Sequence, residues 1–351
     1  MAEPWKNTEW CEGYSSLKRA ELAALPHEIV ERLQYQRPWH SKILLPSDVE
    51  EREDNLDYLE SHDLDCLIIL FRMLIGLGFS QESIKNVIVT CAMHDFGYDR
   101  HADYKVKGML VSRLFPEYVD DKQMLQSKLT FQNLLQHIAV RKLILSAPCF
   151  ELKDRRLLIS DLKDPYRFES TDICSREDLI DTNEVKWDGI STLGQAVADQ
   201  SFDCDPRAKN GTKVSRRYCT LPLFIRVMFT PDKDHMKRFE DVQHFQLKAR
   251  CIEIGNRRIK EFTSDTRYHL QAVVKLDPRN TSPNSAEIRL YDLNGRMLVP
   301  RLESNIDHRD LVGQKIRPDS MWSAGDPSFN FILFYRKWSS LEDEQGCKII
   351  P

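Results

Sequence analysis

The sequence lacks the usual markers of several classes of protein. Its 351 residues carry 50 Lys and Arg against 54 Asp and Glu, a formal net charge of -4 at pH 7. This near balance gives no global electrostatic reason to bind nucleic acid, so we expect nucleic acid to be an unlikely partner. The nine cysteines include no CxxC pair, which argues against a zinc ribbon and against a disulfide framework. This pattern predicts a reducing compartment, the cytoplasm, and leaves the nucleus open.

Markers of membrane insertion and of several common active sites are also missing. The longest apolar run, LDCLIILFRMLIGLGF, is interrupted by Arg72 and is too short to span a bilayer. The first residues show no basic segment followed by an apolar one, so we expect no signal peptide and no membrane association. The sequence contains no P-loop, no GxSxG and no HExxH.

Helical periodicity dominates from residue 61 to about residue 164. Apolar residues recur at i, i+3, i+4 and i+7 in consecutive segments, such as Cys66, Ile69, Leu70 and Met73 in the first of them. Pro116 marks the end of the third segment. The range therefore predicts a bundle of consecutive helices.

Six potential metal ligands lie on or at the ends of these apolar faces: His62, His94, Asp95, His101, His137 and Asp161. Imidazoles and carboxylates are costly to bury unless something compensates their desolvation. A single His on an apolar face is usually an ordinary core or rim residue. One cause would explain all the placements together, namely a divalent metal held inside the bundle.

Four segments resemble the HD superfamily of metal-dependent phosphohydrolases: HDLDCLIILFRMLIGLGF, VIVTCAMHDFGYDRHADYKVKGMLVSRLF, LLQHIAV and RLLISDLKD. The resemblance covers roughly residues 58–168 and implies that His62, His94, Asp95 and Asp161 hold a metal. Asp154 and Asp164 compete with Asp161 for the last position. Imidazole and carboxylate ligands suit Mn, Fe, Zn, Ni or Mg better than a structural zinc site, which favours thiolates.

The resemblance further implies hydrolysis of a phosphate ester, with a nucleotide as the favoured substrate. Asp95, His101 and His137 would serve catalysis, the histidines by binding a second metal or the substrate phosphate, or by protonating the leaving group. The basic residues Arg100, Lys105, Lys107 and Arg141 lie nearby in sequence and would clamp phosphate oxygens, unless they form only a solvated face. Many family members have Lys three residues after the Asp of the HD pair, where this chain has Tyr98.

The remainder of the chain reads differently. The range 169–215 is charged and weakly periodic, and we interpret it as a linker. Short β-branched and aromatic runs follow, and Asn294-Gly295 between two of them predicts a hairpin. The predicted fold class is therefore α+β: an N-terminal extension (1–57), an HD-like helical bundle (58–168), the charged linker (169–215) and a mainly antiparallel β domain (216–351).

The β region supports a second hypothesis. The runs RYHLQAVVKLD, AEIRLYDLNGRMLVP and FNFILFYRKW resemble the closing strands of ubiquitin-specific proteases, but the Gly-His-Tyr segment of that family is absent between residues 272 and 290, and no matching Cys segment occurs near the N-terminus. The alternative to a hydrolase is a non-catalytic HD-like scaffold that binds a protein partner, or a second copy of itself, through the β domain. Tyr98 in place of the family's Lys and the large β region favour this alternative.

Overall fold

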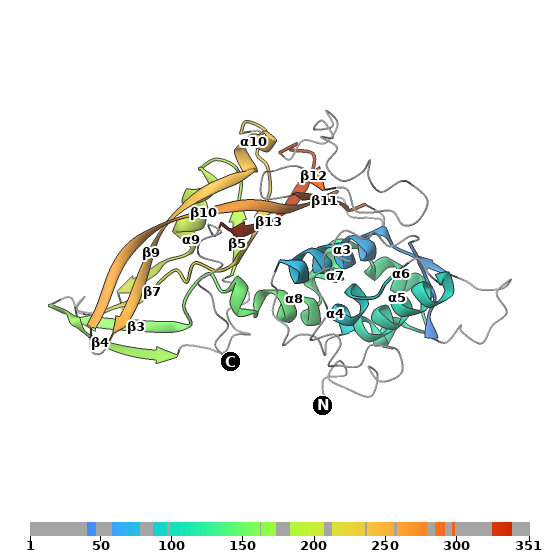
Figure 1. Ribbon diagram of the computed structural model, residues 1–351, viewed down its shortest axis with the longest axis horizontal. Helices are drawn as coiled ribbons and strands as arrows, with labels where there is room; N and C mark the ends of the chain where they lie inside the picture. The colour runs from blue at the N-terminus through green and yellow to red at the C-terminus, as the bar shows by residue number, and fades with distance from the viewer. Residues whose placement is uncertain are drawn as a thin grey trace. The chain divides into compact units, whose positions relative to one another are not determined.

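The computed structural model describes twelve stretches of the chain (Figure 1): 41–46, 58–77, 87–96, 99–161, 163–172, 183–206, 213–235, 237–255, 258–278, 285–291, 297–298 and 325–338. The chain forms two compact units, and neither is continuous in sequence. Unit 1 comprises Met1–Leu143, Val274–Tyr291 and Arg296–Arg317. Unit 2 comprises Ile144–Val273, Asp292–Gly295 and Pro318–Pro351.

Unit 1 contains most of the helices. Its described elements, together with α8, which runs into unit 2, are β1 (Lys42–Ile43), β2 (Leu59–Glu60), α3 (His62–Gly76), α4 (Val87–Ala92), α5 (Arg100–Leu114), the 3-10 turn η6 (Pro116–Tyr118), α6 (Lys122–Lys128), α7 (Phe131–Gln136) and α8 (Ile138–Leu145). Helix starts follow local capping chemistry. Ser61 accepts a hydrogen bond from Leu64 N at 3.0 Å at the start of α3, and Asp99 caps α5 in the same way.

The predicted N-terminal helical bundle is wrong, and helix α3 shows why. Twelve of its fifteen residues are buried, so it needs cover on nearly all sides. Part of that cover comes from β11 (Glu287–Tyr291), far along the chain. The buried Asp63 carboxylate accepts hydrogen bonds from Phe131 N at 2.8 Å and from Ala286 N at 2.9 Å. Unit 1 therefore depends on residues from the second half of the sequence.

The last predicted helix of that bundle is a strand. Residues Arg156–Asp161 form β3, which pairs antiparallel with β4 (Asp164–Asp172) and with β7 (Lys213–Arg217). A six-residue apolar run such as RLLISD is too short for its periodicity to distinguish a helix from a strand. With β6 (Asp203–Pro206), these strands form an antiparallel sheet in the order β4-β3-β7-β6.

A second, larger sheet is mixed rather than antiparallel throughout. Its order is β12-β11-β10-β13-β8-β5, and β9 also pairs with β10. The strands are β5 (Glu184–Trp187), β8 (Phe224–Phe229), β9 (His244–Gly255), β10 (Arg258–Leu276), β11 (Glu287–Tyr291), β12 (Met297–Leu298) and β13 (Asn330–Lys337). Strand β5 runs parallel to β8. Strands β9 and β10 lie side by side as a long antiparallel pair (Figure 1).

The strand-like runs of the sequence are confirmed in β8, β9, β10, β11 and β13. Strands β11 and β12 pair antiparallel, with Leu290 opposite Leu298. This is the pairing that the predicted hairpin requires, although Asn294-Gly295 itself lies outside the described residues. The range interpreted as a linker contains β5, β6 and two-turn helix α9 (Leu193–Gln200).

Aromatic side chains build the core of unit 2. Phe245 stacks on Tyr268 with ring centroids 5.4 Å apart, and Tyr335 meets Phe245 edge-on at 4.9 Å. The Tyr335 hydroxyl donates to Val242 O at 2.7 Å, at the end of the short helix α10 (Phe239–Val242). The buried hydroxyl of Tyr268 likewise donates to Pro222 O at 2.8 Å, so both tyrosines have a hydrogen-bond partner.

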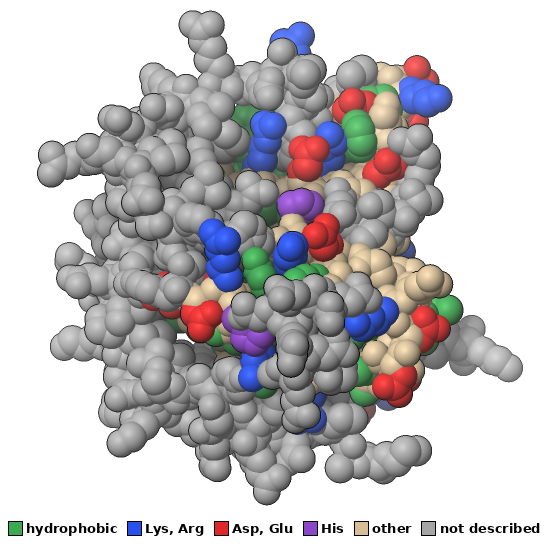
Figure 2. All heavy atoms as spheres, turned by 90° about the vertical axis from the view of Figure 1, so that its right-hand side faces the viewer, with side chains coloured by type: hydrophobic (Ala, Val, Ile, Leu, Met, Phe, Trp, Pro, Cys, Tyr) green, Lys and Arg blue, Asp and Glu red, His purple; other side chains and the backbone are tan. Residues whose placement is uncertain are grey.

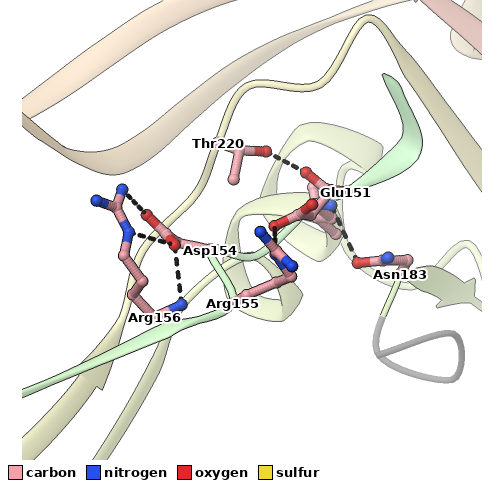
Figure 3. Close-up of polar contacts among 7 residues, drawn as sticks. Glu151, Asp154, Arg155, Arg156, Asn183 and Thr220 are labelled. Atoms are coloured by element: carbon pink, nitrogen blue, oxygen red, sulfur yellow. Dashed lines mark hydrogen bonds and ion pairs between the residues drawn. The ribbon is translucent and has the colours of Figure 1, made fainter. Parts of the chain in front are cut away.

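The chain entering β3 is fixed by polar contacts (Figure 3). Asn183 Oδ1 accepts from Leu152 N at 3.0 Å, and Thr220 Oγ1 donates to Glu151 O. Arg156 binds both oxygens of Asp154, at 3.0 and 2.7 Å. Burial alone would raise the pKa of Asp154, but the hydrogen bonds and charge of Arg156 lower it.

A three-residue ion cluster joins β6 and β7 to the segment before β3. Asp203 accepts from Lys153 Nζ at 2.8 Å and also pairs with Arg217. Burial alone would raise the pKa of Asp203, yet the hydrogen bond and charge of Lys153, together with Arg217, lower it. Because the folded-state pKa is lowered, this carboxylate stabilises the fold above its ordinary pKa of about 3.9 and stops doing so as the pH falls through the lowered value.

We therefore expect Asp203→Asn to make the free energy of unfolding depend less on pH in the acid range. Between pH 5 and pH 2 the free energy of urea unfolding should fall more steeply in the wild type than in Asp203→Asn. The difference should be no more than about 1 kcal/mol, because solvent screens a partly exposed pair. Glu169→Gln, which is exposed on β4, should keep the wild-type slope. Equal slopes in all three proteins would contradict the assignment.

The surface carries both signs of charge. On the face shown in Figure 2, Lys and Arg side chains stand among Asp and Glu side chains, and neither sign forms a continuous field among the coloured residues. Of the helices in the described ranges, none has the length and apolar character needed to cross a bilayer.

Candidate functional site

The structure places the predicted metal ligands on three separate segments of the chain. His62 is the exposed first residue of α3, with Nδ1 2.7 Å from Ser41 Oγ. His94 and Asp95 follow the end of α4 and are half-buried. Asp161 ends strand β3 and belongs to unit 2, where its carboxylate accepts from Lys163 N at 2.9 Å.

The predicted catalytic histidines lie on different elements. His101 is the second residue of α5 and half-buried. His137 stands between α7 and α8, edge-on to the Phe115 ring with centroids 5.1 Å apart. Its Nδ1 accepts from Ala139 N at 3.2 Å, and burial lowers the pKa of the imidazole.

The predicted phosphate-binding residues lie on two helices. Arg100 and Lys105 are on α5, and Arg141 is on α8. Arg100 is exposed, whereas Lys105 and Arg141 are half-buried. The fourth basic residue, Lys107, is 1% exposed and therefore cannot clamp a ligand from its present position.

His94 takes part in a buried charge cluster instead. Its Nε2 lies 2.9 Å from Asp103 Oδ1 on α5, and the Asp103 side chain is only 6% exposed. The His94 ring meets Phe96 edge-on, with centroids 4.7 Å apart. The backbone oxygen of His94 accepts from the Arg72 guanidinium, which also donates to Ala92 O at 2.6 Å. The chain after α4 is thus held between α3 and α5.

A buried ion pair lies in the same cluster. Lys107 Nζ on α5 is 2.6 Å from Asp65 Oδ1 on α3, with side chains 1% and 6% exposed. The charges of Arg72 and Lys107 also lie over the Phe96 ring, at 5.0 and 5.5 Å from its centroid. We call Asp65, Arg72, His94, Asp103 and Lys107 the charge cluster of unit 1.

Cys91 adjoins this cluster but is not activated by it. Burial raises the pKa of its thiol to about 12, and the charges of Lys107 and Arg72 only partly oppose that rise. A thiol in this state is protonated at neutral pH and is a poor nucleophile or metal ligand. Cys91 is therefore a core residue, as its apolar helix pattern indicates.

The cluster does not fit a divalent metal. Its two carboxylates are already offset by two permanent cations, and His94 Nε2 lies against the Asp103 carboxylate. Another cation would add positive charge to a site where Arg72 and Lys107 are buried. In the part of the chain that the structure describes, no three His, Cys, Asp or Glu residues are grouped so as to hold a metal ion.

Several of these residues escaped the sequence reasoning although a signal was present. Asp65 and Arg72 are seven residues apart and share a face of an otherwise apolar helix. Asp103 and Lys107 are four apart on α5. Charges of opposite sign at such spacing on two helices indicate mutual compensation just as well as a metal does.

Two pockets of unit 2 lie beside helix α9. Thr192 caps this helix by accepting from Gln195 N at 3.3 Å, and Leu193, Ala196 and Val197 form its buried stripe. The helix touches β9 closely at Gly194, where an added Cβ would lie 2.2 Å from Gln246 O. Only glycine permits this approach.

The first pocket, between α9 and β9, has a volume of about 500 Å³. It includes Lys237, His244 and Lys248, and we call it the basic pocket. Lys237 Nζ lies 6.0 Å from the Trp187 ring centroid. Its one acidic residue, Asp241, accepts from Arg238 N at 2.8 Å. The remaining lining residues are Thr192, Leu193, Gly194, Gln195, Ala198, Phe245 and Gln246.

The second pocket, between α9 and β5, has a volume of about 540 Å³. Three carboxylates, Glu184, Asp188 and Asp199, line it against the single cation Lys186, and we call it the acidic groove. Trp187 lines both pockets. The other lining residues are Ser191, Ala196, Gln200, Met228 and Thr230.

Comparison with known proteins finds only distant structural similarity. No family model and no curated protein sequence matches the chain. Three solved structures from Saccharomyces cerevisiae are similar to it at low identity. They are the Pan2 pseudoubiquitin hydrolase–RNA exonuclease module with AAUUAA RNA (TM-score 0.38, 10% identity, 85% of this chain and 54% of that one), the same module alone (0.36, 11%, 89% and 57%) and the Pan2 pseudoubiquitin-hydrolase (0.30, 12%, 85% and 86%). This chain spans about half the length of the module, and TM-scores below 0.5 carry no argument about activity.

The expectation that nucleic acid is an unlikely partner has to be withdrawn. The similar structures include Pan2 complexes with AAUUAA and A7 RNA, and the expectation rested on the net charge alone. A formal charge of -4 is a sum over the whole chain, whereas binding depends on local patches. The net charge therefore excludes no class of partner.

Proposed function

We propose that this chain is a non-catalytic protein-binding module that docks an acidic segment of a partner protein in the basic pocket of unit 2. The observation that carries the proposal is the pocket itself: two lysines, a histidine and Trp187 line a space of about 500 Å³. A cavity with an aromatic wall and a few polar groups is the usual form of a ligand site.

The charge of the basic pocket comes from its lysines. Burial lowers the pKa of His244, and the charge of Arg267 lowers it further. The ring is therefore neutral at pH 7, where it acts as a hydrogen-bonding group. Lys237 and Lys248 remain charged and attract carboxylates, and Trp187 offers an apolar surface to the rest of the segment.

The hydrolase hypothesis has less support. It requires a metal held by His62, His94, Asp95 and Asp161, and no group of three His, Cys, Asp or Glu residues suited to a metal ion occurs among the described residues. Tyr98, the departure from the HD pattern, lies outside the described residues.

Fluorescence anisotropy with labelled twelve-residue peptides tests the proposal. An acidic peptide containing one aromatic residue should bind, and its binding should depend on Lys237 and Lys248, whereas any binding of a basic peptide of the same length should not. Lys237→Glu/Lys248→Glu should lower the affinity for the acidic peptide by roughly tenfold or more, which is about 1.4 kcal/mol of binding free energy. Raising the salt from 50 to 300 mM should weaken it as well.

The matched control is Lys213→Glu/Lys260→Glu, which changes the net charge equally at exposed positions on β7 and β10. It should keep most of the affinity. Equal losses in both double variants would show only non-specific attraction and contradict the pocket. Stoichiometric transition metal lost in His94→Ala, with hydrolysis of a phosphate ester, would contradict the non-catalytic assignment.

A further inference from the structure

Strand β5 ends the larger sheet in the strand order. On one side it pairs in parallel with β8, and Trp187 O accepts from Thr230 N at 2.9 Å. Because backbone groups alternate in direction along a strand, the N–H and C=O of Lys186 face away from β8. In the described residues, no further strand pairs with this side of β5.

The side chain of Gln200 occupies the place of a neighbouring strand. Lys186 N donates to Gln200 Oε1 at 3.0 Å, and Gln200 Nε2 donates to Lys186 O at 2.8 Å. A primary amide offers one acceptor and a donor in the same arrangement as a peptide group. Gln200 is the last residue of α9 and half-buried, so its side chain can swing away without breaking the helix.

The acidic groove runs past the Gln200 amide and its two hydrogen bonds to Lys186, which we call the Gln200 latch. Glu184, Lys186 and Gln200, which form or face the edge, all line it, together with Asp188 and Asp199. Glu184 is paired with the buried Arg226 at 3.3 Å, so the charge of the groove comes from Asp188 and Asp199 against Lys186. This excess of negative charge favours a cationic occupant. A strand edge beside a charged groove is the arrangement in which an extended peptide pairs through its backbone and is selected through its side chains.

We infer that β5 is a strand-addition site for an extended basic segment of a partner protein, whose backbone replaces the Gln200 amide at Lys186. This site shares Trp187 with the basic pocket, but it does not depend on the lysines of that pocket. The partner's Lys or Arg side chains would face Asp188 and Asp199 across the groove.

Binding of an eight-residue peptide with alternating Lys and Val tests the inference. The wild type should bind it, and a version methylated on alternate backbone nitrogens should bind at least tenfold more weakly, since methylation removes the donors that pairing needs. Gln200→Ala removes the competing latch and should tighten binding about three- to tenfold, the size of one or two hydrogen bonds. Asp188→Asn/Asp199→Asn should weaken it about tenfold.

Three results would overturn the inference. They are equal binding of the methylated peptide, unchanged affinity in Gln200→Ala, and concentration-dependent self-association of Gln200→Ala without peptide binding, which would make Gln200 a guard against edge pairing. The comparison between the methylated and unmethylated peptides is made with the wild-type protein, so it tests strand addition even if Gln200→Ala folds poorly. Asp205→Asn/Asp265→Asn, at exposed positions on β6 and β10, is the charge control and should not weaken binding.

The same experiments separate this inference from the proposed function. Lys237→Glu/Lys248→Glu should leave binding of the basic peptide within about twofold of the wild type, and Gln200→Ala should leave binding of the acidic peptide unchanged. Loss of either peptide alone then identifies which site has failed.

Discussion

Lys107→Met is expected to destabilise unit 1 by about 3–5 kcal/mol, enough to unfold a marginally stable protein. The substitution leaves the Asp65 carboxylate in a buried site without the cation that lies 2.6 Å from it. Removing one member of a buried pair costs far more than the pair contributes, because the remaining charge is cut off from water. Urea unfolding followed by tryptophan fluorescence and by circular dichroism measures the loss.

Two further variants make this result specific. Lys105→Met, at a half-buried position two residues earlier on the same helix, should cost less than about 1 kcal/mol. Asp65→Leu/Lys107→Met should recover much of the stability lost in Lys107→Met, since an apolar pair of similar volume needs no compensation. A loss below about 1 kcal/mol in Lys107→Met would show that the pair is hydrated and that the charge cluster is not closed.

Gly108→Ala is expected to cost about 3 kcal/mol or more. In an ordinary helix interior the same change is favourable by roughly 1 kcal/mol, because alanine loses less conformational freedom than glycine. Here an added Cβ would lie 1.7 Å from Leu44 O and 2.5 Å from Leu44 C. Leu44 is completely buried, and its N–H donates to Tyr104 O at 3.0 Å, so the segment after β1 cannot simply move away from α5.

The control for this prediction is one turn further along α5. Ser112→Ala removes a hydroxyl that donates to Gly108 O at 2.8 Å, a bond that contributes little to a helix. It should change the free energy of unfolding by less than about 1 kcal/mol. A Gly108→Ala protein as stable as the wild type would mean that the contact between Leu44 and α5 is loose.

These two predictions bear on function as well as on stability. The charge cluster accounts for buried polar groups near His94 that the sequence alone attributes to a metal. Asp65, Arg72, Asp103 and Lys107 are already in compensating contacts, so the burial of these charges needs no metal to explain it. Both binding sites that we propose lie in unit 2, at the two pockets beside α9.

Local structure could be predicted from the sequence where the residues that determine it all lie within one short segment. The helix pattern that begins at His62 and the one that ends before Pro116 are confirmed as α3 and α5, because apolar spacing, a capping residue and a breaker all lie within them. The aromatic and β-branched runs of β8 and β13 are confirmed for the same reason. These signals act between neighbours in the chain.

What the tertiary structure alone decided is how those elements meet. Arg156–Asp161 is a strand because β4 and β7 are there to pair with it. The polar groups around His94 are compensated by residues on two other helices, and β5 has an edge latched by Gln200 only because α9 packs beside it. Charge compensation and strand pairing act across long sequence separations, and a linear pattern records that a polar group is buried without recording what satisfies it.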